Sequence, residues 1–378
     1  MNCIDCNRLI DELNDSREHL ILNAIGGRKR VLGFLCRTCN HTAGRTWDKE
    51  LASQLAPLSS LFAVKRQRGE TQRQRVTTAS GETFYRRPDG VLVPSRPVYK
   101  EVPRSDGTVQ VQIQARTMEE ARDVLRGAKR KYPNIDVEKT LAKVQIEQRY
   151  LDEPVRFSCG IGGAQAGRSI VKSALCLAVS SGVDPRACTD ACAYLKKAEA
   201  VPCFGYYYQR DLLLNRPKAV PLHCVAVSNR GTEGQLLAYA EFFGVHRVVI
   251  RLAEDYAGPD IHVSYAVNPM LGKKLDVTFS LAFPREDIAA CYAYERIPPG
   301  SIEAAYDEVM PVALKNDLQR EWQRAWQSAL SYGLANCGAA SGEMITAEHM
   351  RRASQLAAEK LQPFVSRHLI RRDPPATR

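Results

Sequence analysis

A histidine beside a carboxylate lies between two cysteine pairs near the start of the chain. Glu18 and His19 precede an apolar run and Gly26-Gly27, and each flanking cysteine pair has the spacing Cys-x-x-Cys. An imidazole titrates near neutrality and can take a proton from water, and a carboxylate can hold a hard cation. These residue types suit hydrolytic chemistry, so this segment is the first candidate for a functional site.

The four clustered cysteines predict a structural zinc site. Each Cys-x-x-Cys turn presents two thiolates, and two such turns complete a tetrahedral shell around one zinc ion. Because four thiolates fill the shell, such a site keeps no open position for a water or a substrate. We therefore expect one structural Zn²⁺, held by Cys3, Cys6, Cys36 and Cys39.

The segments around these residues predict a small module that would position them. An apolar strand is expected over 19–27, ending in the Gly-Gly turn, and a second strand over 31–39 that runs into the second cysteine pair. A helix is expected over 40–58, broken or entered near Gly44. Its apolar residues recur at a spacing of four and predict one buried stripe: Trp47, Leu51 and Leu55.

The composition narrows the class of protein. A chain of 378 residues with 44% hydrophobic and 25% charged residues is typical of a soluble protein with two or three domains. We find no apolar run near the ~20 residues of a membrane span, and no secretory signal, so we expect a cytoplasmic protein without a membrane partner. Disulfides are rare in that compartment, and the net charge of +11 favours nucleic acid as the partner.

The combined pattern resembles a known family of nucleases. Cys-x-x-Cys, then Glu-His with an apolar run and Gly-Gly, then Cys-x-x-Cys-Asn is similar to the HNH endonucleases, in their zinc-knuckle branch with a ββα-metal fold. The resemblance covers residues 1–60. It implies that His19 is the general base, and that Glu18 and Asn40 hold a catalytic divalent cation from either side. Carboxylate and amide oxygens suit Mg²⁺ or a similar ion.

Two positions in this pattern have alternatives. The helix ligand is Asn40 or the adjacent His41, which point about 100° apart on a helix, so only one of them can face the ion, and Asn40 is preferred. The middle Asn of the family name has no counterpart in the stretch RKRVLGF. Asn23 could take its orienting role, or it is simply a residue of a turn or strand end.

A basic segment follows the module. Residues 64–80 carry five basic side chains and one acid, Glu70, and have few apolar residues. This composition predicts a linker that either follows a nucleic-acid backbone or serves as a solvated spacer. The candidate nucleic-acid contacts are Lys65, Arg66, Arg68, Arg73 and Arg75.

The rest of the chain predicts a larger body of mixed type. Residues 81–300 are expected to form a mixed α/β domain of unknown role, and 301–378 a helical C-terminal region. Strands are expected at 108–115, 219–228, 246–253 and 261–269, with a hairpin around 88–90 and a helix capped by Thr117. The other eight cysteines, and Trp322 and Trp326, are expected in the core. The fold class is therefore α+β: a zinc-stapled module (1–63), a linker, an α/β body and helices.

The expected function is a metal-dependent HNH endonuclease that hydrolyses phosphodiester bonds in DNA, with double-stranded DNA as the expected partner. The alternative is a zinc-knuckle protein that binds nucleic acid without cutting it. Glu18, His19 and Asn40 together favour the enzyme, because binding alone requires none of them. The sequence leaves open the choice of DNA or RNA, the site recognised and the oligomeric state.

Overall fold

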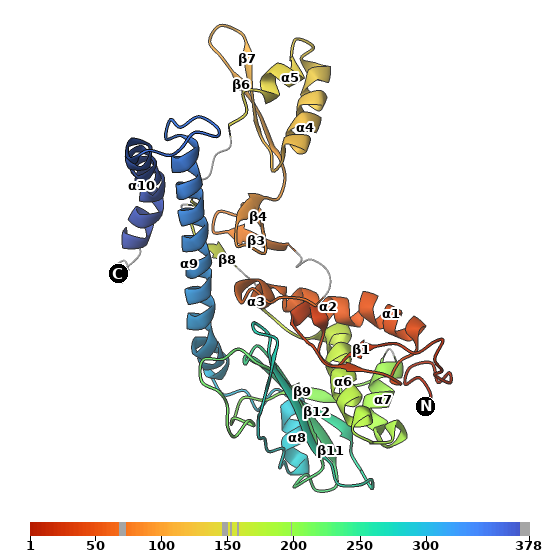
Figure 1. Ribbon diagram of the computed structural model, residues 1–378. Helices are drawn as coiled ribbons and strands as arrows, with labels where there is room; N and C mark the ends of the chain where they lie inside the picture. Colours follow the sequence, from red (N-terminus) through yellow and green to blue (C-terminus); the bar gives the residue numbers. More distant parts are fainter. Residues whose placement is uncertain (68–72, 146–149, 152, 157–158, 198, 371–378) are drawn as a thin grey trace. The chain divides into compact units, whose positions relative to one another are not determined.

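The computed structural model describes residues 1–67, 73–145, 150–151, 153–156, 159–197 and 199–370 (Figure 1). It divides into two compact units, Met1–Met310 and Pro311–Arg378. Helices and strands are both well represented, with a small cysteine-rich segment first and long helices last. The predicted α+β class is therefore confirmed. Among the described residues, no helix is both long and apolar enough to cross a membrane.

The first hairpin is much shorter than the sequence predicts. β1 (Glu18–His19) pairs antiparallel with β2 (Arg30–Val31), so Glu18 lies opposite Val31 and His19 opposite Arg30. The expected strands over 19–27 and 31–39 are wrong in extent. Leu20, Ile21 and Leu22 are all buried, so the apolar run does not alternate between a wet and a dry face. It turns instead into the 3-10 helix η1 (Asn23–Ile25).

The glycines after η1 allow a tight return of the chain. Gly26 has a φ of 97°, which side chains rarely adopt, and a Cβ there would lie 2.9 Å from Pro269. A Cβ on Gly27 would lie 1.7 Å from the backbone oxygen of Ile21. Both positions therefore require glycine, as the predicted Gly-Gly turn implies.

The helical segment expected over 40–58, broken or entered near Gly44, consists of three short helices, and the first break falls at Thr46, close to Gly44. α1 (Arg37–Arg45) begins at the second cysteine pair, with Cys36 as its N-cap, and Thr46 separates it from α2 (Trp47–Gln54). α3 (Ala56–Leu61) follows with a proline in its first turn. Leu51 and Leu55 are fully buried, while Trp47 is only partly buried, so the predicted stripe is confirmed for the two leucines.

A six-stranded antiparallel sheet forms the centre of the first unit. Its order is β14-β13-β10-β11-β12-β9. The strand bounds are β9 Phe204–Tyr206, β10 His223–Ser228, β11 Leu236–Phe242, β12 His246–Ala253, β13 His262–Asn268 and β14 Lys273–Leu275. The predicted strands at 219–228, 246–253 and 261–269 are confirmed. All seven residues of β11 are buried, since it is a central strand of the sheet.

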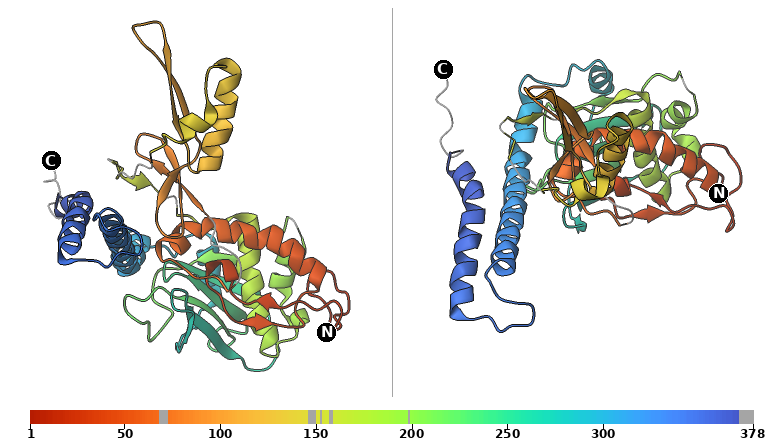
Figure 2. Two further views of the ribbon diagram at one scale, coloured as in Figure 1. Left: turned by 45° about the horizontal axis from the view of Figure 1, so that its top comes forward. Right: turned by 90° about the horizontal axis from the view of Figure 1, so that it is seen from above.

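Helices from the middle of the chain cover this sheet and meet the N-terminal helices. α6 (Gly163–Ser180) contacts β10, β11 and β12 on one side and α2 on another, and α7 (Thr189–Lys196) contacts β12 (Figure 2). α8 (Arg285–Tyr292) packs on β9 and β12. Fourteen residues of α6 are buried, from Ala166 to Val179, because the helix has neighbours on several sides.

Residues 73–156 add two smaller sheets and two helices. The first sheet has the order β5-β4-β3-β8 and the second is the β6-β7 hairpin. The strand bounds are β3 Gln74–Thr78, β4 Thr83–Arg86, β5 Leu92–Pro94, β6 Val98–Pro103, β7 Val109–Gln114 and β8 Val155–Arg156. The hairpin at 88–90 and the strand at 108–115 are confirmed. β3 lies within the segment expected to be a linker.

The helix after β7 begins as the sequence predicts. The hydroxyl of Thr117 accepts a hydrogen bond from the backbone N–H of Glu120, 3.1 Å away, and caps α4 (Met118–Lys131). A further short helix, α5 (Val137–Leu141), packs against α4. Acidic residues occupy the first turn of α4 and basic residues its last turn, which complements the helix dipole.

The second unit is helical, as expected. α9 (Ser301–Ala335) runs into it from the first unit, and α10 (Ala347–Ile370) follows. Trp322 and Trp326 stack with their ring centroids 6.0 Å apart but remain 44% and 45% exposed. The prediction that they lie in the core is wrong. Their spacing places them on one face of α9, where Phe364 covers only part of Trp322.

Candidate active site

The four predicted zinc ligands converge. The sulfur atoms of Cys3, Cys6, Cys36 and Cys39 all lie within 4.8 Å of one another. Sulfurs bound tetrahedrally to one zinc at ~2.3 Å would be roughly 3.8 Å apart, and those of Cys6 and Cys36 are separated by 3.7 Å. The cluster therefore fits a structural zinc-type site, which would fasten the N-terminal loop to the start of α1.

Local backbone geometry prepares these thiols. Asn7 adopts a φ of 59°, which asparagine tolerates better than most residues, so the chain can turn sharply after the first cysteine pair. The backbone N–H of Arg8 is the main cause that lowers the pKa of the Cys6 thiol to about 7. The N–H of Cys36 donates to the sulfur of Cys3 at 3.3 Å. At Cys6 such a donor favours the thiolate, the form that binds metal, whereas burial outweighs the donor at Cys3 and raises the pKa of that thiol.

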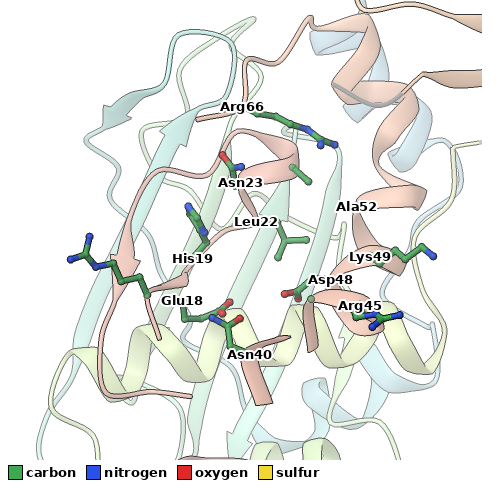
Figure 3. A pocket seen from close by; sticks show the side chains of 13 residues that line it. Glu18, His19, Leu22, Asn23, Asn40, Arg45, Asp48, Lys49, Ala52 and Arg66 are labelled. Atoms are coloured by element: carbon green, nitrogen blue, oxygen red, sulfur yellow. The ribbon is translucent and has the colours of Figure 1, made fainter. Parts of the chain in front are cut away.

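A pocket of about 440 Å³ brings the other candidate residues together (Figure 3). Glu18 and His19 reach it from β1, and Asn40 reaches it from α1. His41 is exposed and does not line this pocket, which agrees with the angle between adjacent helical side chains. Glu18, His19 and Asn40 therefore share one cavity between hairpin and helix.

The carboxylate of Glu18 is buried and bound to a lysine. Its side chain is 4% exposed, and its Oε1 accepts a hydrogen bond from Lys172 Nζ at 2.6 Å. The same ammonium lies 2.6 Å from Oδ2 of Asp48, which also lines the pocket. Burial raises the pKa of Glu18, and the charge of Lys172 opposes that rise. The pocket thus contains two carboxylates that share one ammonium.

Asp48 is bound through both of its oxygens. Its Oδ1 accepts a hydrogen bond from the hydroxyl of Ser169 at 2.6 Å, and Ser169 lies three residues before Lys172 on α6. Asp48 was not predicted from the sequence, because an acid in the first turn of a helix is ordinary. Lys172 was not predicted either, although a charged residue inside the apolar stretch SIVKSALCLAV is a signal for a buried partner.

His19 is half-buried and has neighbours at one ring nitrogen. Its Nε2 accepts a hydrogen bond from Nε–H of Arg30, the residue opposite it on β2, at 3.2 Å, and lies 3.3 Å from Oε1 of Gln67. Nδ1 has no hydrogen-bond partner among the residues that the structure describes. Burial is the main cause that lowers the pKa of His19, and the charge of Arg30 lowers it further. The imidazole is therefore neutral at pH 7.

Asn23 supports this arrangement indirectly. It is the first residue of η1, as expected of a turn residue, and its Oδ1 accepts a hydrogen bond from the backbone N–H of Gln67 at 2.8 Å. Gln67 Oε1 also accepts from Arg30 Nη2 at 3.1 Å. Asn23 thus fixes the backbone of a residue that contacts His19.

The candidate nucleic-acid residues have different locations. Arg66 lines the pocket, while Lys65, Arg73 and Arg75 are exposed elsewhere, the last on β3. Arg68 lies outside the described residues. Three further basic side chains that the sequence analysis did not single out also line the pocket: Arg17, Arg45 and Lys49. All three are exposed and make no ion pair within the described part of the chain.

The hairpin that carries the pocket is anchored to the large sheet through His223 on β10. His223 is fully buried, its Nε2–H donates to the backbone oxygen of Ile25 at 2.8 Å, and its Nδ1 accepts from the N–H of Phe243 at 3.1 Å. Burial lowers its pKa to about 4, so the ring stays neutral. The rings of Phe62 and Phe243 stack at 5.5 Å, which adds an apolar contact at the same junction.

Comparison with known proteins agrees with this geometry. Residues 3–56 match the family model described as HNH endonuclease. No curated protein and no solved structure matches the chain. The N-terminal segment, with its four-cysteine cluster, therefore matches the HNH endonucleases, and this match supports a nuclease-type or nucleic-acid-binding role for the protein.

Proposed function

We propose that this protein is a metal-dependent endonuclease that hydrolyses phosphodiester bonds in DNA. The observation that carries the proposal is the shared pocket of Glu18, His19 and Asn40 inside the segment that matches the HNH endonucleases. A protein that only binds nucleic acid needs none of these three side chains.

His19 would act as the general base. A base must be neutral to accept a proton from water, and the lowered pKa keeps the ring neutral at pH 7. Because Arg30 and Gln67 lie at Nε2, Nδ1 is the nitrogen available to the pocket. The tautomer with a basic Nδ1 carries its hydrogen on Nε2, where Nε2–H would donate to Oε1 of Gln67 in place of accepting from Nε–H of Arg30. That contact would hold the ring while Nδ1 takes the proton.

Glu18 and Asn40 would hold the divalent cation. The donors of the pocket are carboxylate and amide oxygens, the hard ligands that Mg²⁺ prefers. One oxygen of Glu18 binds Lys172, and the other has no partner among the described residues, so it is available to a cation. When bound, the ion would neutralise the scissile phosphate and stabilise the leaving oxygen.

The basic side chains around the pocket would hold the phosphates on either side of the cleaved bond. Arg17, Arg45 and Lys49 are exposed and, among the described residues, have no acidic partner. Unpaired cations next to a pocket suit a polyanion, because binding releases counterions from its backbone. Together with the net charge of +11, they support DNA as the substrate.

A plasmid assay tests this function. We expect the full chain to nick supercoiled plasmid with Mg²⁺ or Mn²⁺, and DNA ligase to seal the nick, since hydrolysis by this family would leave a 5′-phosphate and a 3′-hydroxyl. If no divalent cation supports cleavage but the chain still shifts duplex DNA on a gel, the protein is a binding module, and the enzyme proposal is wrong.

A further inference from the structure

Lys172 joins the HNH segment to a part of the chain outside it. The segment ends at residue 56, while Lys172 belongs to α6, which packs against the large sheet. The lysine side chain is 1% exposed, and both of its acidic partners line the pocket. In Figure 3 the carboxylates of Glu18 and Asp48 point toward the same space as the amide of Asn40.

The energetics of burial argue against a role in stability alone. A buried ammonium loses its hydration, and replacing a buried ion pair with apolar side chains is often neutral or stabilising. The neighbours of Lys172 on α6 are largely apolar, so an apolar residue would suit this helix. The presence of a lysine at this position is explained better by its two partners, the carboxylates of Glu18 and Asp48. Two carboxylates that lie together repel one another, and one ammonium between them removes that repulsion.

α6 also directs a second donor at the same group. Ser169 is fully buried, and its hydroxyl donates to Asp48 Oδ1 while Lys172 donates to Oδ2. Residues three apart lie on the same face of a helix, so one face of α6 binds both oxygens of Asp48 and one oxygen of Glu18. The orientation of both carboxylates is thereby fixed from outside the HNH segment.

We propose that Lys172 is a positioning residue of the nuclease site. It turns one oxygen of Glu18 toward α6 and leaves the other available in the pocket beside Asn40, while it holds Asp48 in place. This inference rests on the proposed function. Its consequence is that the HNH segment is incomplete by itself, because α6 of the larger body must be docked for the site to form.

A double-mutant cycle on the full chain tests the proposal. The variants are Lys172→Met, Glu18→Gln and the combination, compared by single-turnover cleavage of duplex DNA at saturating Mg²⁺. We expect each single variant to lose roughly 10–100-fold in rate, as for residues that orient metal ligands. The combination should be no slower than the slower single variant, because Lys172 acts through Glu18. Rate losses that multiply, or an unchanged rate for Lys172→Met, would contradict the proposal.

A milder pair of variants covers the case in which Lys172→Met does not fold. Ser169→Ala removes one hydrogen bond to Asp48 and should lower the rate by a few-fold. Ser173→Ala is the matched control: its hydroxyl is also buried on α6, but it donates to the backbone oxygen of Ser169 at 3.0 Å. Its cleavage rate should equal that of the wild type. Equal rates for both serine variants would count against positioning by α6.

A readout without catalysis separates this inference from the proposed function. If the wild type cuts no DNA, the proposed function fails, but hydrogen exchange still tests the contact. In Lys172→Met, or in Ser169→Ala if the former is unfolded, peptides with Glu18 or Asp48 should exchange faster. Peptides of the cysteine cluster should be unchanged. Exchange equal to that of the wild type in all these peptides would show that α6 does not hold the two acids.

Discussion

Arg30 lies directly opposite His19 in the β1–β2 pair, and its Nε is 3.2 Å from Nε2 of the imidazole. The strand register therefore sets a permanent positive charge beside the proposed base. Burial is the main cause that lowers the pKa of His19 and keeps the ring neutral, and the charge of Arg30 acts in the same direction.

The first prediction follows from this pair. Arg30→Gln removes the charge that lowers the pKa of His19, so this pKa should rise. The acid side of the pH profile for single-turnover cleavage should then move to higher pH, because the base is lost to protonation sooner. Lys274→Gln, which removes an exposed positive charge on β14 outside the pocket, is the control. An acid limb that stays in place would show that Arg30 does not act on His19.

The second prediction concerns stability and His223. Its pKa is about 4 in the folded protein and near 6.5 when unfolded, so the unfolded chain binds more protons between these values. The contribution of this residue is present above about pH 6.5 and is lost as the pH falls toward 4. From pH 7 to pH 5.5 the loss should be about 1 kcal/mol.

Denaturant unfolding of a non-titrating variant measures this contribution. His223→Gln keeps a donor and an acceptor in the side chain but cannot take up a proton at these pH values. Its free energy of unfolding should fall less than that of the wild type between pH 7 and pH 5.5, by the same ~1 kcal/mol. Equal pH dependence in both proteins would contradict the role given to the neutral ring.

The third prediction concerns the metal. Freshly purified protein should contain one zinc per chain, and Cys36→Ser should lose it, because three thiolates hold the ion less tightly than four. Elemental analysis gives the stoichiometry. Cys192→Ser is the control, since Cys192 is a partly buried cysteine outside the cluster. Wild-type protein without zinc, or a Cys36→Ser variant that retains it fully, would contradict the predicted structural zinc site.

The fourth prediction compares two basic surfaces. In a His19→Ala background, Arg17→Gln, Arg45→Gln and Lys49→Gln should each flatten the salt dependence of duplex binding by ~0.9 in logarithmic slope. Lys274→Gln, an exposed residue on β14, should leave the slope unchanged. Arg73 and Arg75 remain predicted contacts. The salt dependence of their Gln variants decides whether the segment after the module binds the DNA backbone or is only a spacer. Unchanged slopes for the three pocket variants would show that the DNA does not bind beside the pocket.

The sequence predicted features that depend on a few neighbouring residues. Two Cys-x-x-Cys turns need only local geometry to present their sulfurs, and the cluster forms as expected. The lengths of the first strands were not predictable from the run 20–22. Apolar residues buried on every side do not show the alternation that marks a strand.

Contacts between residues far apart in the chain could not be predicted from the sequence. Lys172 lies 154 residues from Glu18, and no local pattern pairs a lysine of α6 with an acid of β1. The spacing of Trp322 and Trp326 shows that they share a helix face, but it does not show whether anything covers that face. The tertiary fold decides both cases.

Single-turnover cleavage of duplex DNA by the wild type and by His19→Ala decides whether His19 is the general base of a nuclease. We expect metal-dependent cleavage by the wild type and a loss of roughly 10²–10⁴-fold in the variant. Zinc content and DNA binding should be the same in both proteins, because His19 belongs to neither function. A His19→Ala variant that cuts as fast as the wild type, with the same metal dependence, would contradict the proposed mechanism.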